Sequence, residues 1–396
     1  MSQWLDRITA RHIVWLCVAS AVVRCAFVLA IEPAIPTAED VAIARHIAAG
    51  NGFAIYDRGP TTIKGPLYPT FVALWLRLLG ERDGLRAVVL VQHLLTAVVP
   101  FLLYLLGGAI RRQRLGTGAA LLFILHPSYF YHPTVAENTA WVVCMGCFWC
   151  VVLFRFEPKR FPPLATLILG TIIGAFVLEK PPLVVPMLIA CVLRFYRWWK
   201  RLALVGVAAA VVVLPWAVRG WIIFGKPTLT KSYSGYLTFI HSWLPSMAVH
   251  PRYAVADSVE HVLDSLGRLP ETDALPALRT LANSIARERW QQLPERTLVH
   301  ALVYWTIPPR YWGNWSVGFI VARLVPVVFL LVLFVWGAIV LWRDDRTLLL
   351  AIGGVLLWTT AFYSLYHVLN IRYKLEVEWL QLLVCAAPLV WESRTP

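Results

Sequence analysis

Two adjacent carboxylates, Glu39 and Asp40, are the side chains in this sequence best suited to acid–base chemistry. They follow a long apolar segment and stand at the expected start of a short helix. A carboxylate at such a place can take the proton of an attacking hydroxyl, so the pair is a candidate catalytic base. Acids in a first helical turn also stabilise the positive end of the helix dipole, and Asp40 could complete a capping box with Thr37. The local sequence leaves both roles open.

Lys64 is the second candidate, in the segment Lys-Gly-Pro-Leu-Tyr-Pro between two expected surface helices. A cation at a membrane surface can bind a lipid phosphate without crossing the bilayer, although the same position suits a lysine that only contacts lipid headgroups. Glu179 and Lys180 form a further polar group at a tight turn between two apolar segments, and we expect them to pair with each other.

The composition indicates that these residues belong to an integral membrane protein. Hydrophobic residues make up 59% of the 396-residue chain and charged residues only 15%, and the apolar residues come in blocks. A bilayer core needs about 20 residues of helix, and about ten stretches approach or reach that length. We therefore predict an all-α polytopic membrane protein with spans near 12–31, 86–110, 115–131, 136–154, 163–178, 181–195, 202–224, 324–342, 347–366 and 375–391.

Basic residues in the short connections predict the orientation of these spans, because Lys and Arg mark the cytoplasmic side. Alternate connections are rich in them, at 111–114, 155–160, 194–201 and 343–346. We therefore expect a multi-pass protein of the plasma (inner) membrane with both termini in the cytoplasm and its active site on the periplasmic face. These flanks account for much of the formal charge of +14, which indicates contact with anionic lipids and no nucleic-acid partner.

Two long polar segments remain, and both are expected on the outer face. The first, 32–85, should hold two surface helices, one ending at Gly50 and one running from Pro66 to Gly80. The second, 225–323, should act as an acceptor-side lid, with an amphipathic helix from 274 to 296 that is interrupted near Pro294. The expected organisation is a membrane module at 1–224 with the catalytic first loop, this lid, and C-terminal spans at 324–396.

Histidine and aromatic residues of the second loop are candidates for substrate contact, and we select His241 among them. The spacing of His241, His250 and His261 fits no metal motif, so neither a catalytic metal nor another cofactor is expected.

Several segments, taken in order, resemble the GT-C superfamily of integral-membrane glycosyltransferases that use polyprenyl-phosphate sugars. The branch that the chain resembles is that of the aminoarabinose and protein O-mannosyl transferases. The resemblance covers most of the chain, and its segments are Glu39-Asp40, 43–53, 64–69, 134–137, 214–227 and 371–373.

This resemblance implies a first-loop acid as catalytic base and a lysine that binds the donor phosphate. The base maps to Asp40 or Glu39, and the lysine to Lys64. The chain departs from the family pattern here, because Asp40 stands where the family has a tyrosine. This departure leaves the choice between the two acids open, and of the two we favour Asp40. The other matched positions are Arg372 and Arg219, expected at the donor phosphate, and Glu137, Tyr68 and Tyr373, expected at the substrate.

The expected reaction is transfer of a sugar from a polyprenyl-phosphate donor to a hydroxyl of lipid A, of a cell-wall glycan or of a protein. A lipid phosphate has a second pKa of about 6 and leaves without protonation, so it needs only a cationic clamp. One base and one clamp predict inversion at the anomeric carbon.

Two alternatives stay open. A transporter or flippase of a lipid-linked glycan would show inverted repeats and broken helices near the membrane midplane. A glycan ligase or polymerase would use a lipid diphosphate donor and rely on arginines in a late loop rather than on a first-loop acid.

Overall fold

The structure is a computed structural model, and it describes residues 5, 7–31, 39–55, 59–225, 228–229, 232–306, 316–366 and 370–390. Within these ranges the regular secondary structure is helical, and β-pairing is limited to one isolated bridge between Ala54 and Pro60. The predicted all-α class is confirmed.

Each predicted span falls on one helix except 115–131, which is divided at His126 between α5 (Gln113–Leu125) and a short helix, α6 (Pro127–Tyr131). Among the described residues, five helices are long and apolar enough to cross a membrane: α2 (Ala10–Ala30), α4 (Leu67–Ala109), α10 (Trp199–Phe224), α16 (Val325–Asp344) and α17 (Arg346–Tyr366). The shorter apolar helices are α5 (Gln113–Leu125), α7 (Thr139–Arg155), α8 (Pro163–Glu179) and α9 (Pro181–Phe195). The last span is α18 (Ile371–Val390). Lipid offers no partner to backbone amides, so apolar blocks of this length fold as helices.

The first outer loop contains the two predicted surface helices. The first is α3 (Glu39–Ala48); its predicted cap, Thr37, lies outside the described residues. The second is the start of α4, which is interrupted at Gly80, where φ is +76°. Only glycine adopts this backbone readily, so the surface helix ends at Gly80 as predicted. The chain then continues directly into the span.

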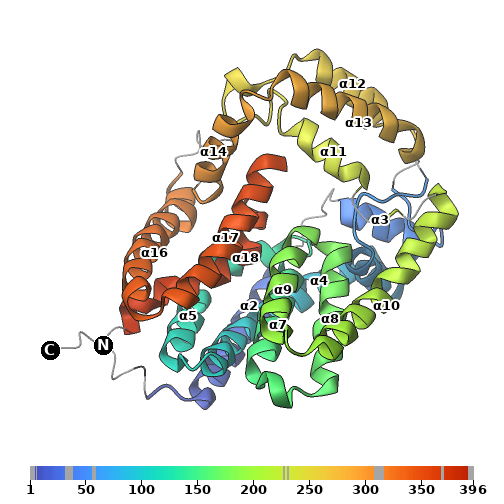
Figure 1. Cartoon of the computed structure of the whole chain (residues 1–396). Coiled ribbons are helices and arrows are strands. Elements are labelled where there is room, and N and C mark those ends of the chain that lie inside the picture. Colours follow the sequence, from blue (N-terminus) through green and yellow to red (C-terminus); the bar gives the residue numbers. More distant parts are fainter. Residues whose placement is uncertain are drawn as a thin grey trace.

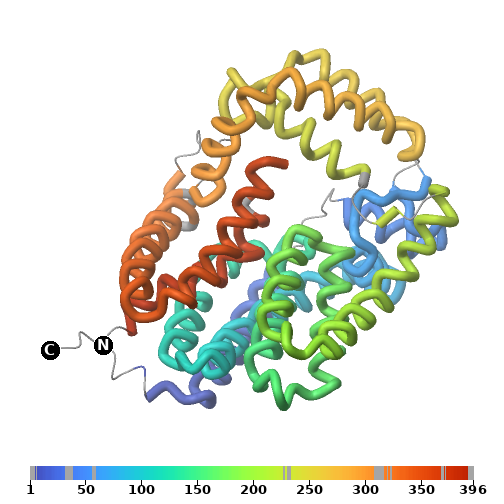
Figure 2. Tube along the Cα trace, in the orientation of Figure 1, coloured from blue at the N-terminus to red at the C-terminus, as the bar shows by residue number. Residues whose placement is uncertain are grey.

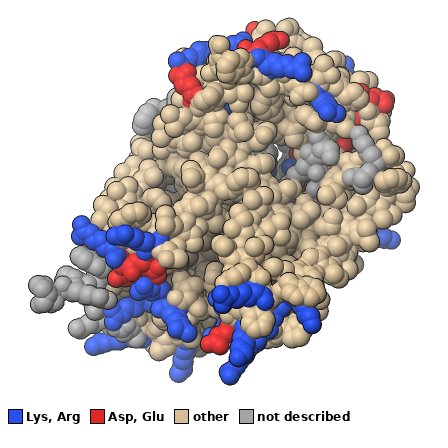
Figure 3. All heavy atoms as spheres, viewed as in Figure 1, with Lys and Arg blue, Asp and Glu red and all other residues tan. Residues whose placement is uncertain are grey.

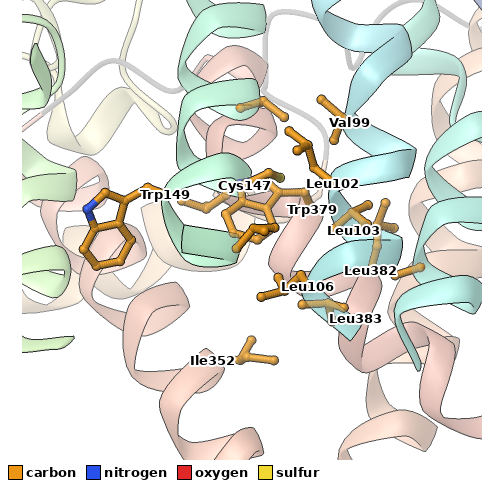
Figure 4. Packing of buried hydrophobic residues seen from close by; sticks show 14 of the residues in the cluster. Val99, Leu102, Leu103, Leu106, Cys147, Trp149, Ile352, Trp379, Leu382 and Leu383 are labelled. Atoms are coloured by element: carbon orange, nitrogen blue, oxygen red, sulfur yellow. The ribbon is translucent and has the colours of Figure 1, made fainter. Parts of the chain in front are cut away.

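Helix α18 lies in the middle of the membrane bundle and packs against α5, α7, α16 and α17. Figure 4 shows Trp379, Leu382 and Leu383 of α18 beside Leu103 of α4 and Cys147 of α7, all of them buried. Close approach requires glycine at one contact: a Cβ on Gly337 of α16 would lie 1.9 Å from a backbone oxygen of α18. Small residues at such positions let helix backbones pack closely in membranes.

The second outer loop folds into a helical cap that arches over one end of the bundle (Figures 1 and 2). Its helices are α11 (Ser232–His241), α12 (Ser258–Leu266), α13 (Glu271–Glu288) and α14 (Leu293–Tyr304). The predicted interruption near Pro294 is confirmed, because Pro294 stands in the first turn of α14. The preceding helix begins three residues earlier than predicted, at Glu271.

The cap is joined to the first outer loop by a shared apolar core. Trp243 and Leu278 of the cap belong to the same buried cluster as Ile43 of α3 and Ile63 of the following turn. The cap therefore rests on the loop that carries the candidate catalytic residues.

Charged side chains divide the visible surface into three zones (Figure 3). Lys and Arg gather at the end that holds the connections between α7 and α8 and between α9 and α10. A broad band with few charges follows, and both signs of charge return over the cap. This distribution is that of a multi-pass membrane protein. Which end faces the cytoplasm stays a prediction.

Candidate active site

The candidate residues meet where several helices end beneath the cap. Glu39 and Asp40 open α3, Lys64 lies in the turn before α4, Glu137 precedes α7, and Arg372 stands in the first turn of α18. Side chains at helix ends and turns are free to point into a shared space, whereas those in mid-span are committed to packing. The fold thus gathers residues from four distant parts of the sequence.

Lys64 forms ion pairs with both neighbouring acids. Its Nζ lies 2.9 Å from Glu39 Oε2 and 3.5 Å from Asp40 Oδ2. The side chain of Asp40 is 5% exposed, that of Lys64 17% and that of Glu39 40%. Burial alone would raise the pKa of Glu39, but the positive charge of Lys64 lowers it below its usual value. Burial opposes the charge on Lys64, yet Asp40 and Glu39 raise its pKa. Glu39 and Lys64 are therefore both ionised at neutral pH.

Arg372 and Glu137 form the second ion pair, with Arg372 Nη1 donating to Glu137 Oε1 at 2.8 Å. Burial would raise the pKa of Glu137, and Arg372 lowers it below its usual value. His132 Nε2 lies 3.7 Å from the other oxygen of Glu137, but burial lowers the pKa of His132 to about 4. His132 is therefore a neutral neighbour of a charged pair.

The two ion pairs act as one electrostatic cluster. The charge of Arg372 reaches Lys64 and Glu39, and the charge of Lys64 reaches Glu137. Two cations thus face three carboxylates in a partly buried space, where charges interact more strongly than in water.

Tyr373 and His241 also belong to this neighbourhood. The Tyr373 hydroxyl accepts a hydrogen bond from Arg372 Nη2 at 3.0 Å, and its ring stacks on Tyr363 with centroids 4.5 Å apart. His241 ends α11 of the cap, within electrostatic reach of Glu39, and burial lowers its pKa. The structure therefore brings six of the predicted residues together with Asp40: Glu39, Lys64, Glu137, His241, Arg372 and Tyr373.

Tyr68 and Arg219 have their hydrogen-bond partners outside this cluster. Tyr68 is 1% exposed, and its hydroxyl donates to Gln92 within the bundle. Arg219 donates to the backbone oxygen of Phe53 at 3.0 Å and lies over the ring of Trp216, 4.4 Å from its centroid. Arg219 thus supports the first outer loop, whereas Tyr68 bonds within α4 and lies within electrostatic reach of Asp40 and Glu137. Their predicted substrate and phosphate contacts remain untested.

The expected pairing of Glu179 with Lys180 is wrong. The Glu179 carboxylate accepts backbone hydrogen bonds at the start of α4, whereas Lys180 forms a buried ion pair with Glu376 of α18. Glu376 also accepts a hydrogen bond from the Tyr363 hydroxyl at 2.9 Å. Neighbours in sequence point to different helices here, and nothing in the local sequence distinguishes their partners.

Glu271 is a further residue that sequence reasoning missed. It begins α13, and its carboxylate is buried against Thr61 and Thr62 of the Lys64 turn.

In the part of the chain that the structure describes, no group of three or more His, Cys, Asp and Glu side chains is arranged to hold a metal ion.

Comparison with known proteins gives structural neighbours only. No protein-family model and no curated protein matches the chain. Solved structures similar to it include the crystal structure of ArnT from Cupriavidus metallidurans bound to undecaprenyl phosphate, with 18% sequence identity and a TM-score of 0.42. The apo state of the same protein has 17% identity and a TM-score of 0.41. Each comparison covers 95% of this chain and 78% of the other.

Proposed function

We propose that this protein is a membrane glycosyltransferase that moves a sugar from a polyprenyl-phosphate donor to an acceptor hydroxyl, with inversion at the anomeric carbon. The observation that carries the proposal is Lys64 held against Glu39 and Asp40, beside the Arg372–Glu137 pair, beneath a cap at one end of a membrane bundle. The group combines a candidate base with two cations within the reach of a lipid-borne phosphate.

The two cations, Lys64 and Arg372, stabilise the phosphate of the donor. As the sugar–phosphate bond breaks, negative charge grows on the departing lipid phosphate, and fixed cations in a poorly solvated site stabilise that charge. Lys64 and Arg372 are paired with carboxylates here, and a bound phosphate would take over part of those contacts. Glu39 is 40% exposed and free to turn away, whereas the more deeply buried Asp40 keeps its place.

A carboxylate of the cluster activates the acceptor hydroxyl. We assign Asp40 as the base that takes the proton of the attacking hydroxyl, with Glu39 as the alternative, while Glu137 holds the guanidinium of Arg372. Attack opposite the phosphate needs one base and no covalent intermediate, which is why inversion is proposed. His241 and Tyr373 border the cluster and are proposed to contact the substrate. The acceptor is proposed to approach from the periplasmic side.

The test uses the purified protein in lipid nanodiscs with a panel of polyprenyl-phosphate sugars and lipid diphosphate sugars. Asp40→Asn should reduce the turnover rate by about 10²- to 10⁴-fold, as expected for loss of a general base. Glu39→Gln should have the smaller effect. Asp344→Asn is the matched control, because Asp344 ends α16 and forms an exposed ion pair with Arg112, which lies between α4 and α5.

A double variant, Glu39→Gln with Asp40→Asn, that transfers sugar at the wild-type rate would contradict the mechanism. Consumption of a lipid diphosphate sugar alone would favour the ligase or polymerase. A protein that consumes no donor but carries a lipid-linked glycan across vesicles is a transporter.

A further inference from the structure

The turn that carries Lys64 is fixed at both ends by carboxylates from other parts of the fold. At its start, Glu271 Oε2 accepts hydrogen bonds from Thr61 Oγ1 at 2.8 Å and from the Thr62 amide at 2.7 Å. The other carboxylate oxygen accepts from the Thr62 hydroxyl. All three residues are buried. A buried carboxylate is costly unless it is hydrogen-bonded, so this contact ties α13 of the cap firmly to the turn.

Glu179 fixes the other end of the same turn. Its Oε1 accepts from the amides of Leu67 at 2.7 Å and Tyr68 at 3.3 Å, which are the first two residues of α4. Amides in the first turn of a helix have no partner within the helix, so a carboxylate is a suitable acceptor for them. Its Oε2 accepts a hydrogen bond from Nδ2 of Asn138 at 3.1 Å, and Asn138 directly follows Glu137, the ion-pair partner of Arg372.

Gly65 shows how closely Glu179 approaches the turn. A Cβ at this position would lie 2.5 Å from Glu179 Oε1 and 2.5 Å from the backbone oxygen of Leu178. Only glycine leaves room for the carboxylate directly after Lys64. The backbone on either side of Lys64 is therefore held, although the lysine side chain itself is long and flexible.

We propose that Glu271 and Glu179 are positioning residues that place Lys64 for the donor phosphate. Since Glu271 belongs to the cap, docking of the cap on the first outer loop sets the position of Lys64. Binding of the donor phosphate thereby depends on a contact made by the acceptor-side loop. This inference rests on the proposed function, in which Lys64 binds that phosphate.

The first test compares Glu271→Ala and Glu179→Ala in two backgrounds, with Lys64 and with Lys64→Ala. With Lys64 present, each variant should raise the KM for the polyprenyl-phosphate sugar about 10- to 100-fold, as small displacements of positioning groups do. The KM for the acceptor should stay unchanged. In the Lys64→Ala background the same substitutions should have no further effect, because residues that act through one group are not additive.

The matched control is Glu288→Gln, an exposed acid at the other end of α13, which should leave both KM values unchanged. The Gln variants of Glu271 and Glu179 keep one acceptor oxygen and should recover part of the loss. Thr62→Val, which removes a single donor to Glu271, gives a milder version should Glu271→Ala fail to fold. Equal KM increases in both backgrounds would overturn the proposal.

A second measurement is independent of catalysis. Amine-reactive labelling followed by mass spectrometry should show faster modification of Lys64 in the Glu271→Ala and Glu179→Ala proteins, relative to the exposed Lys159 as internal reference. Unchanged labelling of Lys64 in both variants would refute the positioning role. If instead Lys64→Ala alone leaves the donor KM unchanged, the proposed function fails, while the labelling still decides whether these carboxylates position Lys64.

Discussion

Replacement of Lys64 by Met tests whether the base lies in the electric field of this lysine. The change removes an ammonium that lies 2.9 Å from Glu39 and 3.5 Å from Asp40 and keeps the length of the side chain. An opposite charge at such distances shifts a carboxyl pKa by about 1–3 units. In the wild type, Lys64 outweighs burial and lowers the pKa of Glu39. In the variant, burial raises the pKa of Glu39 against only the smaller effects of Arg372 and His241.

With Glu39 as the base, the acidic limb of the rate profile should therefore move to higher pH by about 1–3 units. The assay is the initial rate of donor consumption at low donor concentration, from about pH 4 to pH 8, which reports ionisation of the free enzyme. Loss of the phosphate contact should also lower kcat/KM by about 10²- to 10³-fold at every pH, and this drop is separate from the shift.

Lys64→Arg is the control, because it keeps the positive charge and should leave the acidic limb in place. A Lys64→Met protein with its acidic limb at the wild-type pH would refute the reasoning. The base would then be a group other than Glu39.

Three further predictions concern stability, each measured as a thermal unfolding midpoint in detergent. Gly337→Ala should destabilise the protein by about 1–3 kcal/mol, because its Cβ would lie 1.9 Å from a backbone oxygen, whereas Gly206→Ala, with open space around the added Cβ, should not. Lys180→Met should lower the free energy of unfolding by about 3–5 kcal/mol, because it leaves Glu376 buried without its cation. Adding Glu376→Gln should restore most of this stability, and an equal loss in the single and double variants would contradict the prediction. Because burial lowers the pKa of His132 to about 4, the unfolded chain takes up the proton first as the pH falls below 6.5. Stability should then drop by up to about 3 kcal/mol between pH 6.5 and pH 4, and His132→Asn should reduce that drop.

The helices of this protein follow closely from local sequence. Lipid forces long apolar blocks into helices, so nine of the ten predicted spans are each one helix. The exception is 115–131, which is divided before Pro127 into α5 and α6. Gly80 and Pro294 mark helix interruptions for equally local reasons, a left-handed backbone and a missing amide. Helix ends are less predictable: the amphipathic helix begins at Glu271, where hydrogen bonds to a distant turn stabilise its first residue.

The site is only partly a local property. The acids and Lys64 are recognisable from residue type and from their place outside the spans. Their partners are not, because the pairs join distant segments: Arg372 and Glu137 are 235 positions apart, and Thr62 and Glu271 are 209 apart. The hydrogen bond from the Tyr68 hydroxyl to Gln92 is likewise a property of the fold, and the substrate contact predicted for Tyr68 stays a prediction.

The sequence by itself therefore determined the membrane class, the positions of the helices and the identity of the main charged candidates, since each depends on hydrophobicity or residue type over a short window. Tertiary structure alone decided how the charges pair. Glu179 and Lys180 are adjacent, yet one holds the start of α4 and the other binds Glu376, because their side chains leave a tight turn toward different helices. The packing of α18 and of the cap brings Arg372 and Glu271 to the first outer loop, and only there do the separate polar segments become one site.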